Sequence, residues 1–450
     1  MTEAAQLNFP AGFTWGVSTS AYQIEGATSQ DGRGTSIWDT FAHQPGRVVD
    51  GTTGDVACDH YHRYPEDVAL MADLGVSAYR FSIAWPRIQP DGTSPANPAG
   101  LAFYDRLVDA LLDRGIDPVA TLFHWDLPQA LEDRGGWLAR DTAYRFAEYA
   151  DLVARQLGDR VKLWITLNEP FVHMSYGYGM GVHAPGRMHL FDAFPVAHHQ
   201  LLGHGLAVDA LRAHTGNPIG IANNYSPVWL RGDTEADRAA AGAYDALHNR
   251  LFTDPLFGRG YPGELALDSA VTPDGPVVRE GDLEIVARPI DFLGVNYYNP
   301  TGVRAPEEDG PLPFDLVPLD GYPTTNFDWP VAPDGLLDLL TTLRTTYGEA
   351  LPPIHITEGG CSYDDVLTAD GHCDDPERVA YLAGHLQAVR EAMDAGVDVR
   401  GYFVWSLMDN FEWAEGFTKR FGLVHVDFDT QVRTPKTSYA WYRDLIARQP

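Results

Sequence analysis

The chain has 450 residues, of which 44% are hydrophobic and 21% charged, so it holds enough apolar material for a large core. Its 32 Lys and Arg against 62 Asp and Glu give a formal net charge of −30, which repels nucleic-acid backbones and anionic lipid surfaces. No apolar run approaches the roughly 18 residues of a membrane span, and the start MTEAAQLNFP lacks the features of a secretory signal. We therefore expect a globular, cytoplasmic protein that binds neither nucleic acid nor membrane.

Short runs rich in β-branched and aromatic residues alternate with amphipathic stretches along the chain. Eight of these runs are predicted strands, at 13–24, 78–88, 117–125, 162–168, 218–226, 291–298, 353–358 and 400–407. Helices are predicted between them, at 101–114, 142–157, 193–214, 335–347 and 376–396. Alternating strands and helices form parallel sheets, and eight such units close most naturally into a (β/α)8 TIM barrel of the α/β class.

The competing fold is an open doubly wound sheet, which would bind a nucleotide after its first strand. The segment TWGVSTSAYQIEG contains neither GxGxxG nor GxxxxGK[ST], so the barrel is favoured. Two segments without helical periodicity, 254–277 and 303–335, are expected to be long βα loops at the C-terminal face of the barrel. Because no linker divides the sequence, we expect a single domain over 1–450.

The active site of such a barrel lies at the carboxyl ends of its strands. Polar and aromatic side chains lie in or directly after seven of the eight predicted strands: Gln23, Arg80, His124, Trp125, Asn168, Glu169, Asn296, Tyr298, Glu358, Trp405, Glu412 and Trp413. Buried polar groups without partners cost about 1–3 kcal/mol each, so this gathering favours a binding pocket over a role in stability. Trp329, in the long segment 303–335, is expected to line the aglycone side of that pocket, with a purely structural role in covering the barrel as the alternative.

Glu169 and Glu358 end the fourth and seventh predicted strands, which face each other across the ring. A barrel radius of roughly 8 Å and a side-chain reach of roughly 4–5 Å leave a gap of roughly 5 Å between the two carboxylates. That gap resembles the roughly 5–5.5 Å of a retaining glycosidase more than the roughly 6.5–9.5 Å of an inverting one. Arg80 and Tyr298 can donate to Glu358 and keep it ionised, whereas Glu169 follows the apolar run LWITLN and is expected to hold a proton.

The aromatic residues at the same strand ends suit a sugar. Trp125, Trp405 and Trp413 offer apolar faces that pack on the C–H face of a pyranose. The hydroxyl groups of the sugar can be bound by the side chains of Gln23, His124, Asn168 and Glu412.

Metal binding is not expected. The histidines of VAHHQLLGHGLAV and of ACDHYHRYPED have no carboxylate completing a ligand set, and HExxH is absent. The three cysteines, Cys58, Cys361 and Cys373, are too scattered for a CxxC site. We therefore predict neither a metal nor a cofactor.

These motifs resemble glycoside hydrolase family 1, the β-glucosidase family. The similar segments are FPAGFTWGVSTSAYQIEG, YRFSIAWPRI, LFHWDLPQAL, WITLNEP, FLGVNYY, ITEGG and GYFVWSLMDNFEWAEGFTKRFGLVHVDF, which span nearly the whole chain. The resemblance implies that Glu169 is the acid/base and Glu358 the nucleophile. One departure is Gly359, which stands where the family motif usually has Asn.

The resemblance also implies roles for the surrounding residues. The terminal sugar would be held by Gln23, His124, Asn168, Glu412 and Trp413, with Trp405 as a platform beneath it. Asn296 and Tyr298 would support the 2-hydroxyl and the nucleophile, and Arg80 would lie at the base of the nucleophile. The Glu412-Trp413 pair is typical of members that prefer sugars without a 6-phosphate.

We therefore expect a retaining exo-β-glucosidase that acts on cellobiose, cello-oligosaccharides and aryl glucosides, with side activity on β-galactosides and β-fucosides and a role in cellulose degradation. Three alternatives stay open: β-galactosidase as the main activity, a catalytically inactive sugar-binding barrel, and a metal-dependent barrel hydrolase. Assembly into a homo-oligomer also stays open.

Overall fold

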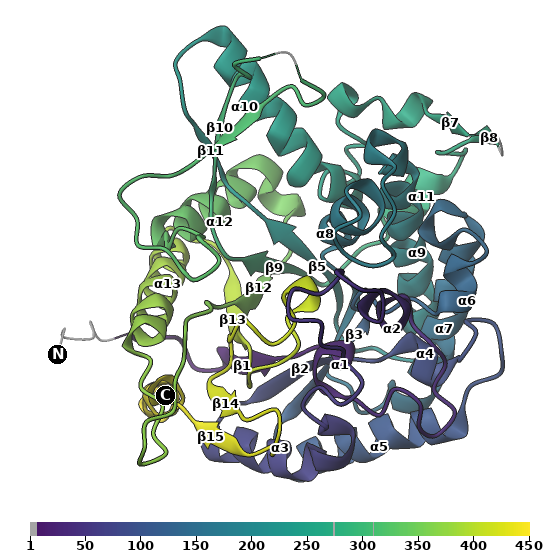
Figure 1. Cartoon of the computed structure of the whole chain (residues 1–450). Coiled ribbons are helices and arrows are strands. Elements are labelled where there is room, and N and C mark those ends of the chain that lie inside the picture. The colour runs from purple at the N-terminus through teal and green to yellow at the C-terminus, as the bar shows by residue number, and fades with distance from the viewer. Residues whose placement is uncertain (1–6, 273–274, 309) are drawn as a thin grey trace.

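A closed barrel of eight parallel strands forms the centre of the protein, which a computed structural model describes over residues 7–272, 275–308 and 310–450 (Figure 1). Around the ring the strands follow the order β1-β13-β12-β9-β5-β4-β3-β2. Their bounds are β1 (Thr14–Ser18), β2 (Ala78–Ser82), β3 (Asp117–Phe123), β4 (Leu163–Asn168), β5 (Ile219–Tyr225), β9 (Phe292–Tyr297), β12 (Ile354–Gly359) and β13 (Val399–Trp405). Each coincides with a predicted strand, so the (β/α)8 TIM barrel is confirmed.

Two of the strands are shorter than predicted. β1 gives way to the short helix α1 (Ala21–Ile24), and β2 to α4 (Trp85–Ile88). All the residues of both helices are buried, so they look like the continuation of a buried strand. A single helical turn is too short to show a period of 3.6 residues, which is why the sequence pattern failed here.

Helices surround the barrel. The larger ones are α3 (His60–Leu74), α5 (Pro98–Leu112), α7 (Asp141–Leu157), α9 (Phe194–Arg212), α12 (Pro333–Tyr347), α13 (Pro376–Asp394) and α14 (Thr437–Ile446). The five predicted helices correspond to α5, α7, α9, α12 and α13. α7 shows why they pack: Ala143, Phe146 and Ala150 are buried on one face at helical spacing. Pro98, Pro333 and Pro376 each occupy the first helical position, where the missing N–H costs nothing.

The long loops carry small elements of their own. In segment 303–335, β11 (Asp315–Val317) pairs with β10 (Thr301–Arg304), which pairs with β6 (Val228–Leu230) in a three-stranded sheet covered by α10 (Glu235–His248). Segment 254–277 contains short 3-10 turns and the pair β7 (Val271–Thr272) and β8 (Gly275–Pro276). The remaining elements are α2 (Ile37–Ala42), α6 (Gln129–Glu132), α8 (Pro170–Val172), α11 (Asp282–Val286), β14 (Val424–Val426) and β15 (Arg433–Pro435).

Apolar side chains fill one layer of the barrel interior. Six strands contribute one buried residue each to a cluster of Ala78, Val119, Ile165, Ala222, Phe292 and Phe403. Gly16 of β1 makes room for the Phe403 ring, because a Cβ there would lie 2.2 Å from a ring carbon. The polar site occupies the opposite, carboxyl end of the strands. No helix in the described part of the chain is both long and apolar enough to cross a membrane.

Candidate active site

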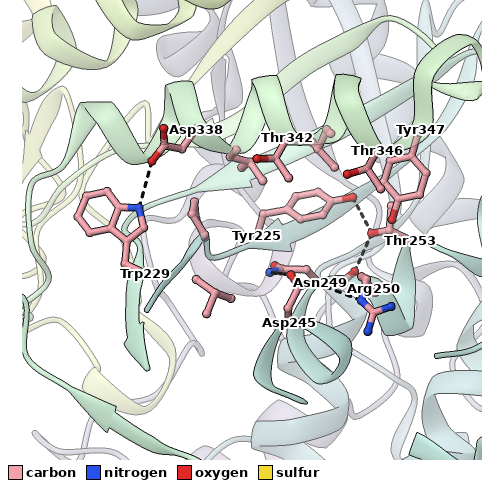
Figure 2. Close-up of a pocket in the computed structure, with 14 residues that line it drawn as sticks. Tyr225, Trp229, Asp245, Asn249, Arg250, Thr253, Asp338, Thr342, Thr346 and Tyr347 are labelled. Atoms are coloured by element: carbon pink, nitrogen blue, oxygen red, sulfur yellow. Dashed lines mark hydrogen bonds and ion pairs between the residues drawn. The ribbon is translucent and has the colours of Figure 1, made fainter. Parts of the chain in front are cut away.

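Among the cavities of the described residues, two lie on either side of Tyr225 at the carboxyl end of β5. The larger, of about 500 Å³, is lined by both Glu169 and Glu358. The smaller, of about 330 Å³, lies between α10 and α12 (Figure 2). Because the predicted catalytic carboxylates meet in the larger cavity, that cavity is the candidate active site. The predicted site residues that line it are His124, Trp125, Glu169, Tyr298, Trp329, Glu358, Trp405, Glu412 and Trp413.

The other predicted residues lie behind this lining and bond to it. Arg80 and Asn296 are buried and donate hydrogen bonds to Glu358 and Glu169, respectively. Gln23, on α1, is also buried; its amide donates to the carbonyl of Phe411 at 2.9 Å and lies 3.4 Å from Oε2 of Glu412. These side chains therefore lie directly behind the residues that face the cavity.

Glu358 projects from β12 just after a register shift. Pairing between β12 and β9 slips between Ile356 and Glu358, a bulge that re-aims the side chain at the end of the strand. Arg80 Nη1 donates to Oε1 at 2.7 Å, and the Tyr298 hydroxyl donates to Oε2 at 2.8 Å. Burial raises the pKa of Glu358, while the Arg80 charge and these two hydrogen bonds stabilise its ionised form.

Glu169 follows the last residue of β4 in a left-handed backbone conformation, with φ 44°. Such a conformation is unfavourable for a residue with a side chain and is typical of functional sites. Asn296 Nδ2 donates to Oε1 of Glu169 at 2.8 Å. Burial, and next the negative charge of Glu358, raise the pKa of Glu169 to about 8. This shift favours the protonated form of Glu169 near neutral pH.

Asn168 connects the two carboxylates. Its Oδ1 accepts from Arg80 Nη2 at 2.6 Å and from Asn296 Nδ2 at 3.0 Å, which fixes the orientation of the amide. Nδ2 of Asn168 must then donate to Nε2 of His124, 3.0 Å away. Burial, and then the Arg80 charge, lower the pKa of His124, so the ring is neutral and its proton lies on Nδ1. That nitrogen has no partner among the described residues and is free to donate to a ligand.

Aromatic rings form the walls. The Trp125 and Trp413 rings lie 4.6 Å apart, and His124 stacks on Trp405 at 5.8 Å. Trp125 and Trp413 have φ values of 74° and 50°, so they share the unusual backbone conformation of Glu169. Trp329 stacks on Phe327 at 4.5 Å on the outer side. Aromatic rings packed in this way provide broad apolar faces beside polar groups.

A third acidic side chain, Glu412, shares the cavity. Burial, and next the charge of Glu358, raise its pKa to about 8. Glu412 is therefore mostly protonated at neutral pH and can both donate and accept hydrogen bonds. Such a group suits hydroxyl groups of a neutral ligand.

Gly359 fits its surroundings. A Cβ at this position would lie 2.6 Å from the hydroxyl oxygen of Tyr402. The Tyr402 side chain therefore occupies space that a larger residue at position 359 would need, and Glu358 keeps its contacts with Arg80 and Tyr298.

The cavity is also lined by residues that were not predicted from the sequence, among them Val172, Tyr176, His183, Asn224, Tyr244, His248 and Leu316. Asn224 is the next-to-last residue of β5, the one barrel strand for which no site residue was predicted, so its position at a strand end was an available signal. Tyr244 and His248 come from α10, and Leu316 from β11. These elements belong to long loops, whose positions no strand pattern gives.

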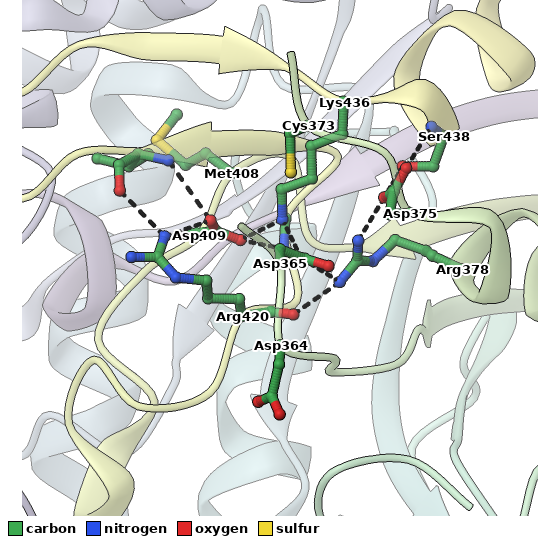
Figure 3. A network of polar contacts seen from close by, with 12 residues as sticks. Asp364, Asp365, Cys373, Asp375, Arg378, Met408, Asp409, Arg420, Lys436 and Ser438 are labelled. Carbon is green, nitrogen blue, oxygen red and sulfur yellow. Dashed lines mark hydrogen bonds and ion pairs between the residues drawn. The ribbon is translucent and has the colours of Figure 1, made fainter. Parts of the chain in front are cut away.

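Buried charges anchor the loop that carries Glu412 and Trp413 (Figure 3). The Asp409 carboxylate accepts from Arg420 at 2.7 Å, from the Gly422 amide at 2.9 Å and from Lys436 at 2.7 Å. Lys436 also bonds to Asp365, in the loop after β12. The network therefore ties the loops after β12 and β13 to the start of α14.

Within residues 7–272, 275–308 and 310–450, no group of three or more His, Cys, Asp or Glu side chains is arranged to hold a metal ion. His198 bonds to Tyr261 and Asp282, and His204 to Thr166, so these buried rings have protein partners.

Comparison with known proteins gives the family. The model of glycosyl hydrolase family 1 matches residues 5–450. Thermostable beta-glucosidase B of Thermobispora bispora is 51% identical over 99% of this chain and 92% of its own length. The bifunctional beta-D-glucosidase/beta-D-fucosidase of Bifidobacterium breve is 45% identical over 98% of each chain. The family 1 β-glucosidase of Thermotoga maritima in complex with isofagomine lactam superposes with a TM-score of 0.92, at 43% identity and 98% coverage of both chains. The resemblance is confirmed, and the chain belongs to glycosyl hydrolase family 1.

Proposed function

We propose that this chain is a retaining β-glucosidase that removes terminal β-D-glucosyl residues from small glycosides such as cellobiose, cello-oligosaccharides and aryl glucosides. The observation that carries the proposal is a pair of buried carboxylates in one cavity with opposite environments. Glu358 is held by a guanidinium and a phenol, whereas the pKa of Glu169 is raised to about 8. A retaining glycosidase needs such a charged nucleophile beside a protonated acid.

The reaction follows from these two states. Glu358 attacks the anomeric carbon and forms a covalent glycosyl ester, while Glu169 gives its proton to the leaving oxygen. Glu169, now a carboxylate, takes a proton from water as the water attacks the anomeric carbon. The bond between the anomeric carbon and Glu358 breaks in the same displacement, glucose leaves, and both carboxylates return to their starting states. No step requires a metal or cofactor.

The remaining residues bind the sugar and position these groups. We propose that His124 and Glu412 bind the hydroxyl groups of the terminal sugar. Gln23, Asn168 and Asn296, which lie directly behind the lining, would bind them as well. Trp405 and Trp413 would pack on its C–H face, Trp125 beside them, and Trp329 against the aglycone. The free Nδ1–H of His124 supports this assignment, since it is a buried donor without a partner in the described structure.

A second activity on β-D-fucosides is favoured by the Bifidobacterium breve relative, whose name gives both activities. β-Galactosidase as the main activity is the competing proposal within catalysis. Rates on nitrophenyl β-D-glucoside, β-D-fucoside and β-D-galactoside, measured side by side, decide the ranking.

The setting of the enzyme is part of the proposal. Cellobiose as a substrate would make this chain a late step of cellulose degradation. The three cysteines are free and buried, which suits a reducing cytoplasm. We further propose one catalytic domain over residues 1–450, supported by the family match over 5–450. Light scattering would determine whether the chain forms a homo-oligomer.

Trapping with an activated 2-deoxy-2-fluoroglucoside, followed by peptide mapping, tests the proposal. We expect one label per chain on Glu358. A label on another residue would overturn the assignment of the nucleophile. Glucose binding without hydrolysis of any aryl β-glycoside would point to an inactive sugar-binding barrel, and loss of activity with a chelator would point to a metal-dependent hydrolase.

A further inference from the structure

The smaller cavity, between α10 and α12, lies outside the catalytic site (Figure 2). Its volume of about 330 Å³ falls within the range of small-molecule sites, which begins near 300 Å³. Tyr225, the last residue of β5, lines both this cavity and the active site, so the two spaces lie on either side of the end of β5. None of the proposed catalytic or sugar-binding residues lines the smaller cavity.

The wall formed by α12 has two parallel stripes. Leu339, Leu343 and Tyr347 recur every four residues, face the cavity and are nearly buried. One position earlier in each turn stand Asp338, Thr342 and Thr346, which also line the cavity. Residues four apart lie on the same helix face at a rise of about 6 Å. The wall therefore presents an apolar stripe beside a row of oxygen atoms spaced about 6 Å apart.

The threonines on α12 differ in what their hydroxyls do. Thr341 and Thr345, which do not line the cavity, return their hydroxyls to backbone carbonyls of the helix at 2.8 and 2.7 Å. Thr342 and Thr346 line the cavity as exposed residues, and no side-chain hydrogen bond joins their hydroxyls to the described part of the chain. They are therefore available to a ligand as donors and acceptors.

Aromatic and charged side chains complete the cavity. Trp229 stands at one end, held by a hydrogen bond of 3.1 Å from Nε1 to Asp338, and Tyr225 lies between the two helices (Figure 2). Arg250 is paired with Asp245 at 3.1 Å and with Glu264 at 2.9 Å, so its charge is already balanced. Among the lining residues Arg250 and Asp245 offset each other, so the Asp338 carboxylate leaves the cavity negative, which disfavours phosphates and carboxylates.

We propose that this cavity is a second carbohydrate site, which binds a neutral pyranosyl sugar of one or two rings. The apolar stripe and the Trp229 and Tyr225 rings suit the C–H faces of the sugar. The row of Asp338, Thr342 and Thr346 oxygens suits its hydroxyl groups, which can donate to the carboxylate and exchange hydrogen bonds with the threonines. The ligand class follows from the side chains of this cavity and stands apart from the proposed catalytic function.

The test uses 4-thiocellobiose, whose sulfur-linked rings resist hydrolysis, with the unmodified full chain. Calorimetry is expected to give two molecules bound per chain, and soaked crystals to show the second molecule between α10 and α12. T342V/T346V is expected to weaken the second site at least tenfold. T341V/T345V, which removes two hydroxyls from the same helix outside the cavity, is the matched control and should keep both sites. Both double variants should hydrolyse aryl β-glucosides at the rate of the parent chain.

Three results would overturn the proposal: one molecule bound per chain with the second cavity vacant in soaked crystals, equal loss of the second site in both double variants, or benzylammonium filling the cavity where thiocellobiose does not. The last result would mark the site as one for an organic cation held by Asp245, Asp338 and the aromatic rings. Failure of thiocellobiose to bind in the catalytic cavity would instead count against the proposed function, so the two failures are distinguishable.

Discussion

Tyr298 donates its hydroxyl hydrogen to Oε2 of Glu358 across 2.8 Å. Because Arg80 holds the other oxygen at 2.7 Å, both oxygens of this carboxylate have donors suited to a negative charge. Glu169 shares the cavity but receives its close hydrogen bond from a neutral amide, Asn296. Two buried carboxylates that repel each other do not both ionise easily, so these contacts favour the charge on Glu358 and the proton on Glu169.

Replacing Tyr298 with Phe removes one donor from the charged form of Glu358. The pKa of Glu358 should rise, and since the nucleophile must be ionised, the acidic limb of kcat/KM should move to higher pH. A hydrogen bond to a charged group contributes about 1.5–3 kcal/mol, so we expect kcat/KM to fall about 10- to 100-fold. Tyr439→Phe, which removes a hydroxyl bonded to Leu70 far from the cavity, is the control and should leave the limb in place. An unmoved acidic limb in Tyr298→Phe would contradict the assignment.

Glu169 should set the alkaline limb. Its pKa of about 8 means that the general acid is protonated below pH 8 and that activity falls as the pH rises through this value. Glu169→Gln cannot titrate, so its pH profile should lose that limb. The variant should lose most activity on glucosides with poor leaving groups but keep the first step on a dinitrophenyl glucoside, which needs no proton. Azide should then restore turnover and give the β-glycosyl azide. A preserved alkaline limb would assign the acid to another group.

The barrel could be predicted from the sequence because eight buried strands alternate with amphipathic helices, and each signal is local. The positions of Glu169 and Glu358 at the ends of two strands likewise predicted that they share a cavity, since the carboxyl ends of parallel strands meet at one end of the barrel. The separation of the two carboxylates near 5 Å stays a prediction. The local pattern failed at α1 and α4, where one buried helical turn looks like strand.

Other features of the site depend on contacts between distant segments. The left-handed backbone of Trp125, Glu169 and Trp413 is imposed by packing, because no glycine marks these positions. Similarly, no local sequence pattern indicates that Lys436 bonds to Asp365, which lies 71 residues earlier in the chain. The candidate catalytic and binding residues could therefore be predicted from the sequence more fully than the contacts that hold them in place.

Sugars with a 6-phosphate should be poor substrates. Among the described residues, those lining the catalytic cavity include neither Lys nor Arg. Burial lowers the pKa of His183 and His248 to about 3, so these rings carry no charge at neutral pH. A phosphate would lose its hydration there without gaining a cation. We expect kcat/KM for nitrophenyl 6-phospho-β-glucoside to be at least 100-fold below that for the unphosphorylated compound. The difference should persist at pH 6, where Glu412, with its pKa of about 8, is protonated. Comparable rates would show that the cavity contains a phosphate site.

Lys436→Met should destabilise the fold and the loop that carries Glu412. Burial disfavours the charge of Asp409, but Lys436 and Arg420 outweigh it and lower the pKa of the carboxyl. Removing the buried ammonium leaves Asp365 and Asp409 partly unpaired, and breaking such a pair costs about 3–5 kcal/mol. We expect the free energy of unfolding to fall by about 3 kcal/mol, because Asp365 keeps Arg378 and Asp409 keeps Arg420 as a partner.

Urea unfolding at several pH values measures this loss, with Lys162→Met as the control, because Lys162 is exposed. A carboxyl whose pKa is lowered by folding stabilises the protein above its unfolded pKa of about 4, and that contribution disappears as the pH falls through the folded value. The gap between Lys436→Met and the parent chain should therefore be full at neutral pH and shrink below about pH 4. KM for an aryl glucoside should rise more than kcat falls, since Asp409 anchors the loop of Glu412 and Trp413 and touches neither Glu169 nor Glu358. A loss of stability equal to that of Lys162→Met would show that the network contributes nothing to the fold.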